Sequence, residues 1–176
     1  MKILLLGGSK SGKSMLAQEL THAMGGKLYY LATMAPSDAE DDARIARHRE
    51  ERAGWGYETV EQAERLEECF PRIDPAGTVL LDSVTALLAQ EMFGHGFDEA
   101  AGQRTAKELL ALGDHAANVV YVSDQIFSDG REFDSWTECY RAQLALVCRE
   151  LAKHCDGVAE VTAGVPKWHK KVEDLP

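Results

Sequence analysis

Four residues near the start of the chain have the types and the spacing of a phosphate-binding loop. Gly7 is followed, after four residues, by Gly12, Lys13 and Ser14, which gives the pattern GxxxxGK[ST]. Glycine lets the backbone turn tightly and bring successive N–H groups onto phosphate oxygens, and the helix that follows adds its positive end. The lysine can reach the β- and γ-phosphates, and the serine hydroxyl can ligate Mg²⁺. The pattern therefore predicts a nucleoside triphosphate site formed by Gly7, Gly8, Ser9, Lys10, Ser11, Gly12, Lys13 and Ser14.

A phosphate-binding loop also needs a carboxylate as a second partner for Mg²⁺, usually at the end of a neighbouring apolar strand. The run Thr78-Val79-Leu80-Leu81-Asp82 has this form, so we expect Asp82 and Ser14 to hold the metal ion. Capping of the next helix is the alternative role for Asp82. Asp124 follows the apolar run of residues 119–123 and is the competing carboxylate.

A second group of residues could take part in phosphate chemistry. Arg44, His48 and Arg52 recur at intervals of four and would share one face of a helix, with Arg47 and Arg49 beside them. A neutral imidazole can attack phosphorus, and guanidinium groups would stabilise the charge that develops. Four carboxylates also occur between residues 41 and 51, so a solvated charged face is the alternative. The spacing alone does not decide between the two.

These residues require a scaffold in which strands and helices alternate. Short apolar, β-branched runs predict strands at residues 2–6, 27–32, 56–59, 78–82, 118–123 and 157–163. Longer periodic runs predict helices at residues 13–24, 38–52, 61–69, 83–93, 99–116 and 136–154. This alternation indicates an α/β fold: a three-layer sandwich of the P-loop NTPase type with a mostly parallel central sheet, built as a single domain over residues 1–176. The polar segment 123–135 follows a strand and is interpreted as an active-site loop.

The composition argues against some partners and compartments. A formal net charge of −10 argues against nucleic acid or an anionic membrane surface as the main partner. The four cysteines show no zinc-ligand spacing and no CxxC pair, so we expect them to be buried as reduced thiols. No apolar run reaches the length of a membrane span, which favours a cytoplasmic protein. The basic segment 167–171 is expected to be a solvated terminus.

Four stretches together resemble a known family. They are residues 7–14, Tyr30-Leu31-Ala32-Thr33, the arginine- and histidine-containing residues 44–49, and Leu80-Leu81-Asp82-Ser83-Val84-Thr85. They are similar to the bifunctional adenosylcobinamide kinase/adenosylcobinamide-phosphate guanylyltransferases of cobalamin biosynthesis. The phosphate-binding loop alone would not separate this family from many others, whereas the arginine–histidine helix after Tyr-Leu-Ala-Thr is much more specific.

The resemblance implies two reactions. Such enzymes phosphorylate the aminopropanol hydroxyl of adenosylcobinamide with a nucleoside triphosphate, and then transfer GMP from GTP to that phosphate through a guanylylated histidine. The matching histidine is His48, with Arg44 and Arg47 or Arg49 as electrostatic helpers, and Thr33 is a nucleotide contact by position. Members look like homotrimers. The preference for GTP over ATP is implied by the resemblance alone.

The sequence also departs from the family pattern on the expected substrate side. The usual Asn-Glu-Val-Gly segment is replaced by residues 123–127, in which the amide of Gln125 takes the place of a carboxylate. Residues 145–149 replace a Gly-Arg-x-Asn-Gln segment. Gln90 takes the place of an asparagine. Two other functions therefore remain open. One is a P-loop kinase of another small acceptor that forms no covalent intermediate, and the other is a nucleotide-binding regulatory protein.

Overall fold

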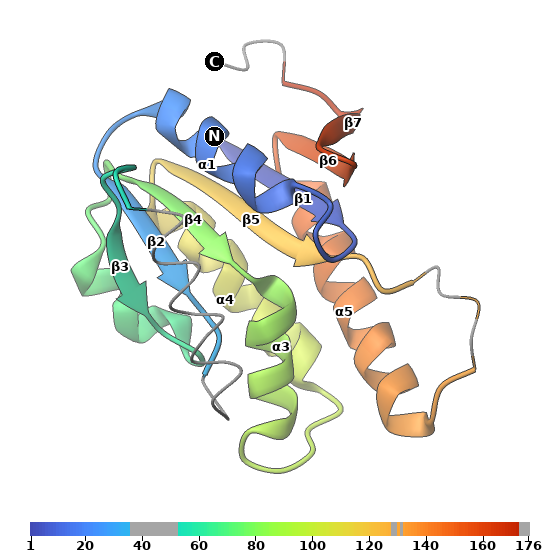
Figure 1. The fold of residues 1–176 in the computed structure, drawn as a ribbon. Helices are drawn as coiled ribbons and strands as arrows, with labels where there is room; N and C mark the ends of the chain where they lie inside the picture. The colour runs from blue at the N-terminus through green and yellow to red at the C-terminus, as the bar shows by residue number, and fades with distance from the viewer. Residues whose placement is uncertain (36–52, 128–129, 131, 173–176) are drawn as a thin grey trace.

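One sheet of seven strands forms the centre of the protein. The structure is a computed structural model that describes residues 1–35, 53–127, 130 and 132–172. The strand order is β3-β2-β4-β5-β1-β6-β7, and Figure 1 shows its twist. The first six strands along the chain run parallel, and β7 pairs antiparallel with β6. The strands are β1 Lys2–Gly7, β2 Leu28–Ala32, β3 Glu58–Glu61, β4 Thr78–Asp82, β5 Asn118–Asp124, β6 Gly157–Thr162 and β7 Val165–Lys170.

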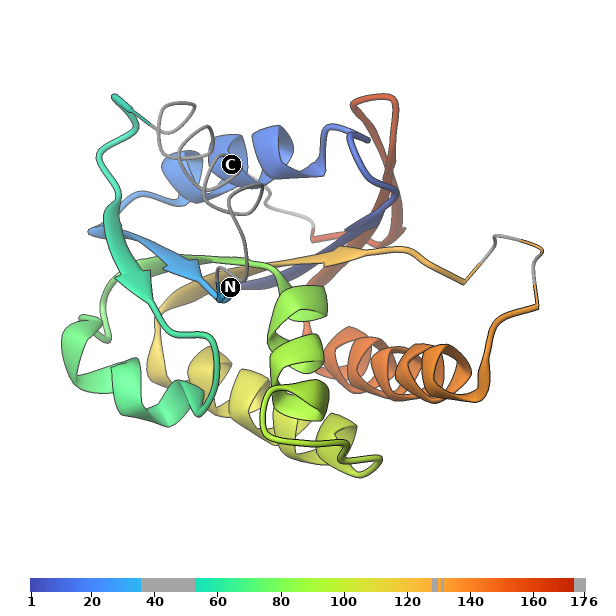
Figure 2. The same ribbon diagram turned by 60° about the horizontal axis from the view of Figure 1, so that its bottom comes forward.

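Helices cover both faces of this sheet, as the turned view in Figure 2 shows. One face is packed by α1, whereas α3, α4, α5 and the short 3₁₀ helix η1 contribute to the core on the other face. This arrangement confirms the predicted three-layer α/β fold. The helices are α1 Lys13–Met24, η1 Leu66–Arg72, α3 Val84–Phe93, α4 Ala101–His115 and α5 Ser135–His154.

The alternation of side chains along β1 explains why its sequence is continuously apolar. Ile3 and Leu5 are fully buried on the face that α1 covers, and Leu4 is fully buried in the core formed with α4 and α5. A parallel strand between two helical layers needs apolar residues at every position. The same pattern holds in the middle of β4 and β5. Because β4, β5 and β1 are parallel neighbours, their carboxyl ends lie together at one edge of the sheet.

One sequence prediction is wrong and another is incomplete. The helix expected at residues 61–69 does not form: β3 extends to Glu61, and the chain then passes through Arg65 in a left-handed conformation (φ 49°) into η1. Val60, 2% exposed, anchors this strand in the core. The segment 167–171 is largely exposed, as expected of a solvated terminus, but its first four residues lie in β7 and Trp168 packs against the α1-side core.

Other predictions are confirmed with small shifts in their boundaries. The helix at 13–24 and the strand at 78–82 agree with α1 and β4 at both ends. Cys69, Cys148 and Cys155 are buried free thiols, and Cys139 is half-buried. The helix expected at residues 38–52 lies outside the described residues. Within the described residues, no helix combines the length and the apolar character that crossing a membrane requires.

Candidate nucleotide-binding site

The loop between β1 and α1 has the backbone geometry of an anion cradle. Gly12 precedes the helix with φ 93° and Lys10 has φ 59°, so the chain turns through left-handed conformations. The N–H group of Ser11 donates to the carbonyl oxygen of Gly8 at 3.2 Å and tightens the turn. Within the described chain, no side chain caps the start of α1, and its first turn contains no acidic residue. The first N–H groups of α1 are therefore left for an external anion such as phosphate.

Lys13 is the buried cation of this loop. It is 7% exposed, and its ammonium nitrogen donates to the carbonyl oxygen of Gly8 at 3.1 Å. The same nitrogen lies 2.6 Å from a carboxylate oxygen of Asp124, which is the last residue of β5. A buried charge is costly without a partner, so these two contacts hold the side chain folded back over the loop.

Strand order decides which carboxylate reaches Lys13. β5 is the immediate neighbour of β1, and Asp124 is opposite Gly7 in the register. Asp82 ends β4, one strand further away, and is opposite Val122 of β5. The carboxylate of Asp82 instead accepts a hydrogen bond from the Tyr30 hydroxyl at 2.9 Å. Asp82 and Asp124 follow the α1-side core residues by alternation along their strands, so both carboxylates lie on the face that carries the phosphate loop.

The donor set fits a Mg²⁺ ion that arrives with a nucleotide. Among the described residues, no group of three or more histidine, cysteine or acidic side chains could hold a metal ion alone. Mg²⁺ is usually bound by one or two carboxylates together with substrate phosphates and water, so such a cluster is not needed. Ser14, which is half-buried at the start of α1, and Asp82 are the expected ligands, and the metal role of each stays a prediction.

The ends of β2 and β4 are tied together beside this site. The hydroxyl of Thr33 donates to the carbonyl oxygen of Ser83 at 2.7 Å and accepts from the N–H group of Ser83 at 2.8 Å. Thr33 is fully buried, so these bonds make it a brace between the two strand ends. The expected contact of Thr33 with the nucleotide stays a prediction. Two residues after Ser83, the Thr85 hydroxyl accepts a hydrogen bond from the N–H group of Asp124 at 2.8 Å and fixes the end of β5.

The turn between β6 and β7 is a component of the site that the sequence did not reveal. The N–H group of Gly164 donates to the carbonyl oxygen of Ser11 at 2.7 Å. A Cβ atom on Gly12 would lie 2.9 Å from the Cα atom of Gly164, and one on Gly7 would lie 2.7 Å from the carbonyl oxygen of Val161. Gly7 and Gly12 must therefore lack a side chain to leave room for the β6–β7 hairpin, in addition to letting the loop approach the phosphates. The only sequence signal was a glycine after the β6 run.

The expected active-site loop after β5 is partly described. Its first residues are pinned by Arg141 of α5, whose guanidinium donates to the carbonyl oxygens of Ile126 and Phe127 at 3.1 Å each. The N–H group of Gln125 donates to the carbonyl oxygen of Gly7 at 2.9 Å and continues the pairing of β5 with β1. Arg141 was not among the predicted site residues. The expected catalytic His48 and its neighbours Arg44, Arg47 and Arg49 lie outside the described residues.

Comparison with known proteins identifies the family. Residues 3–168 match the family described as cobinamide kinase / cobinamide phosphate guanyltransferase. The chain belongs to this family. Membership in the cobinamide kinase / cobinamide phosphate guanyltransferase family confirms the resemblance read from the sequence and the expected class of enzyme.

Individual relatives agree with this assignment. The chain is 30% identical over 168 residues to the bifunctional adenosylcobalamin biosynthesis protein CobP of Pseudomonas aeruginosa, which covers 94% of this chain and 95% of that protein. It is 37% identical over 100 residues to the bifunctional adenosylcobalamin biosynthesis protein CobU of Escherichia coli, covering 56% of this chain and 54% of that protein. These similarities concern long stretches of the chain, and the roles of individual residues stay predictions.

Solved structures support the fold of this family member. A prototypical ATPase from the type III secretion system of pathogenic bacteria aligns with a TM-score of 0.54 and 14% identity. The alignment covers 92% of this chain but 51% of that chain, so this protein spans about half of the longer ATPase. At this identity the likeness concerns the fold alone, and it agrees with a P-loop NTPase architecture.

Proposed function

We propose that this protein phosphorylates adenosylcobinamide with a nucleoside triphosphate and then transfers GMP from GTP to the resulting phosphate, giving adenosylcobinamide-GDP. The observation that carries the proposal is the phosphate loop itself. An uncapped helix start, a buried Lys13 and a facing Asp124 lie together in a chain that belongs to the cobinamide kinase/guanyltransferase family.

In the kinase reaction, the loop holds the transferred phosphoryl group. The backbone N–H groups of Gly8 and Gly12 and the uncapped first N–H groups of α1 bind phosphate oxygens, and Lys13 neutralises charge on the β- and γ-phosphates. Ser14 and Asp82 would hold Mg²⁺, which would supply further neutralisation of the phosphate charge. The hydroxyl oxygen of the acceptor forms a bond to the γ-phosphorus as the bond to the leaving nucleoside diphosphate breaks.

In the guanylyl transfer, His48 is the proposed nucleophile. A neutral ring nitrogen forms a bond to the α-phosphorus of GTP, and pyrophosphate leaves. A phosphate oxygen of adenosylcobinamide phosphate then attacks the same phosphorus and breaks the bond to nitrogen, which releases His48 unchanged. Arg44 and Arg47 or Arg49 stabilise the negative charge that develops on the phosphoryl oxygens. This assignment rests on the sequence pattern and the resemblance.

Covalent labelling tests the histidine mechanism. The protein is incubated with Mg²⁺ and GTP labelled on the α-phosphate, denatured, and analysed for label that is stable in base and labile in acid, as a phosphoramidate is. We expect label on the wild type and on His154→Ala, a control at an exposed histidine of α5, and none on His48→Ala. Absence of label from the wild type would exclude the covalent mechanism.

A separate assay tests the kinase step. Transfer of label from the γ-phosphate of ATP or GTP to adenosylcobinamide is measured for the same variants, and we expect His48→Ala to retain it. Transfer without any covalent label would support a simple kinase, and binding of nucleotide without transfer to this acceptor would support one of the other two functions.

We also propose that the protein acts in the cytoplasm as a homo-oligomer, a trimer by resemblance. Sedimentation equilibrium of the purified chain, whose mass is 19.4 kDa, measures the oligomeric state directly. A monomeric mass at working concentrations would contradict the trimer.

A further inference from the structure

A small group of exposed aromatic side chains lies at the end of α3 and the start of α5. Phe93 is 43% exposed, Phe97 is 40% exposed and Trp136 is 54% exposed. The ring centroids of Phe93 and Phe97 are 5.9 Å apart, and those of Phe97 and Trp136 are 4.1 Å apart. We call these three residues the aromatic platform. Contiguous exposed rings are unfavourable in water and usually mark a binding surface.

The platform is held in place by regular structure. Phe93 is the last residue of α3, and Trp136 lies in the first turn of α5, where its N–H group donates to the capping carboxylate of Asp134 at 2.9 Å. The loop that carries Phe97 is closed by a bond from the N–H group of Asp98 to the carbonyl oxygen of Met92, also at 2.9 Å. The rings are therefore preorganised, which lowers the entropic cost of binding.

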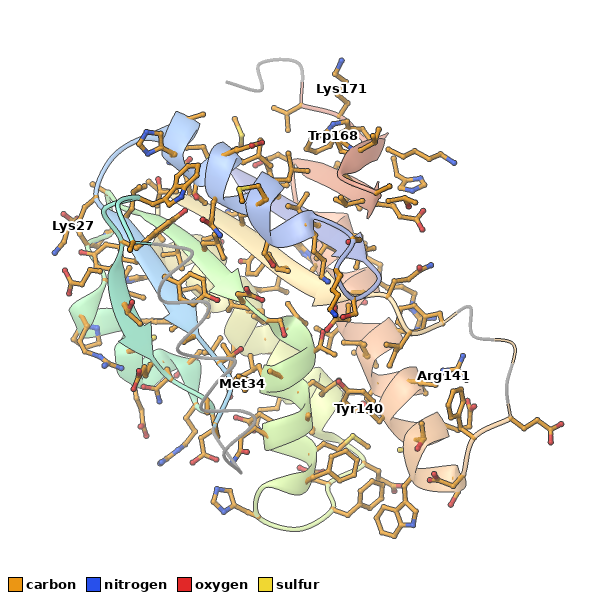
Figure 3. All side chains as sticks on the ribbon, viewed as in Figure 1. Lys27, Met34, Tyr140, Arg141, Trp168 and Lys171 are labelled. Carbon is orange, nitrogen blue, oxygen red and sulfur yellow. The ribbon has the colours of Figure 1, made fainter. Side chains whose placement is uncertain are left out.

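A chain of contacts connects the platform to the phosphate loop. The ring of Phe93 lies 6.1 Å from that of Tyr140, whose hydroxyl donates to the carbonyl oxygen of Thr85 at 2.8 Å. Thr85 in turn accepts from the N–H group of Asp124, the partner of Lys13. Figure 3 shows Tyr140 between α3 and α5. Burial raises the pKa of the Tyr140 hydroxyl, so this donor stays protonated.

The helix α3 sets the platform away from the carboxyl end of β4. α3 starts two residues after the end of β4 and extends beyond the carboxyl edge of the sheet, as Figure 1 shows. Ten residues at 1.5 Å each give a reach of about 15 Å. This separation suits an acceptor whose reacting hydroxyl sits on an arm and whose broad body lies elsewhere.

The charges around the platform favour a cation. The two segments that carry the rings, residues 93–99 and 132–138, contain five carboxylates and neither lysine nor arginine. Two of these carboxylates are paired with arginines: Asp98 with Arg104 of α4 at 2.9 Å, and Glu138 with Arg141 one turn further along α5 at 2.6 Å. Negative charge therefore remains in excess. Aromatic faces also attract cations.

We propose that the aromatic platform binds the corrin macrocycle of the acceptor, while the aminopropanol arm reaches the phosphate loop. This inference rests on the proposed function. An alkylcobalt(III) corrin without a phosphate group is a broad ring system with apolar faces and a net positive charge, which matches both the rings and the surrounding carboxylates. A second protein copy fits less well, because the exposed part of three rings is roughly 300 Å², against about 800 Å² per partner in a stable interface.

Binding of adenosylcobinamide in the absence of nucleotide tests the platform. Equilibrium dialysis measures its Kd for the wild type, Trp136→Leu, Trp136→Phe and the control Trp55→Leu, a half-buried tryptophan that contacts His22. We expect about a tenfold higher Kd for Trp136→Leu, equivalent to about 1.4 kcal/mol. Trp136→Phe and Trp55→Leu should stay near the wild-type value. In the kinase assay, Trp136→Leu should raise KM for adenosylcobinamide and leave the Kd for nucleotide unchanged.

Three results would overturn the proposal in different ways. Unchanged corrinoid binding by Trp136→Leu, in a wild type that binds and phosphorylates adenosylcobinamide, would reject the platform and leave the proposed function intact. A lower oligomer mass of Trp136→Leu without corrinoid would identify the platform as a subunit interface. Failure of the wild type to bind adenosylcobinamide would reject the proposed function and the platform together. Circular dichroism melting of each variant checks that the fold is retained.

Discussion

The ammonium nitrogen of Lys13 lies 2.6 Å from a carboxylate oxygen of Asp124, across the junction of β1 and β5. This ion pair occupies the lysine that the bound triphosphate would need. Nucleotide binding must therefore exchange one anionic partner of Lys13 for another. The exchange keeps a buried cation paired at every stage, because an unpaired charge at this depth would be strongly destabilising.

Replacement of the two partners should have opposite effects on binding. We expect Lys13→Ala to raise the Kd for nucleoside triphosphate about a hundredfold, because it removes charge-assisted hydrogen bonds worth about 2.7 kcal/mol. Asp124→Asn should lower the Kd about threefold when Mg²⁺ is absent, because it removes a competing and repelling charge. Titration with a fluorescent nucleotide in EDTA measures both constants. Weaker binding by Asp124→Asn would instead show that the carboxylate positions Lys13.

The dependence on Mg²⁺ should separate the two carboxylates. Asp124 is the partner of Lys13 in the structure, whereas the carboxylate of Asp82 accepts a hydrogen bond from the Tyr30 hydroxyl and is the expected Mg²⁺ ligand. We expect Asp82→Asn to raise the Mg²⁺ concentration for half-maximal kinase activity about tenfold or more, since a carboxylate oxygen is a preferred ligand of this ion. Asp124→Asn should shift it much less, and Tyr30→Phe serves as a control. The reverse order would assign the metal to Asp124.

The central sheet could be predicted well because its signals are local. β4 is buried on both faces around the apolar run of residues 79–81, and α1 begins directly after the loop glycine Gly12. β7 was missed because it has the features of a protected edge strand, namely Pro166 and several basic residues. The turn before it uses Ala163 and Gly164, both with positive φ, in place of the usual asparagine or aspartate before glycine.

The site could be predicted only where one segment contains it. The spacing of residues 7–14 specifies a phosphate loop, but the partner of Lys13 depends on strand order, which no local pattern encodes. Both Asp82 and Asp124 end apolar strands, and only the placement of β5 beside β1 brings Asp124 to the lysine. The contact of Gly164 with Ser11 likewise joins residues 153 positions apart.

The reactivity of the cysteines should follow their burial. Burial raises the pKa of the Cys69 thiol to about 11 and that of Cys155 to about 12, and it also raises the pKa of Cys148. These thiols are protonated at pH 8, so a disulfide reagent should modify one thiol per native chain, Cys139, and four after unfolding. Cys139→Ala should abolish modification of the native chain by the reagent. Rapid modification of a second thiol in the native wild type would contradict the prediction.

The same shifts give a dependence of stability on pH. A folded-state pKa above the unfolded value of 9.0 means that the native chain retains protons that the unfolded chain loses. This contribution to the free energy of unfolding is fully present below pH 9 and decreases as the pH rises toward about 11 to 12. Denaturant titrations at pH 8 and pH 10 measure it. In Cys69→Ala the decrease should be smaller.

The hairpin contact with the phosphate loop should matter for binding more than for stability. Gly164 has φ 79° and Gly56 has φ 80°, and neither would place a Cβ atom within 4 Å of another residue. Alanine at either position should therefore cost similar backbone strain, about 1 kcal/mol, or about 2–4 °C in Tm. The N–H group of Gly164 also donates to the carbonyl oxygen of Ser11, and the Cα atom of Gly164 lies where a Cβ atom on Gly12 would project. Displacement of that turn should raise the Kd for nucleotide several-fold in Gly164→Ala and leave it unchanged in Gly56→Ala. Equal nucleotide affinity in the two variants, at equal losses of Tm, would show that the hairpin only supports the fold.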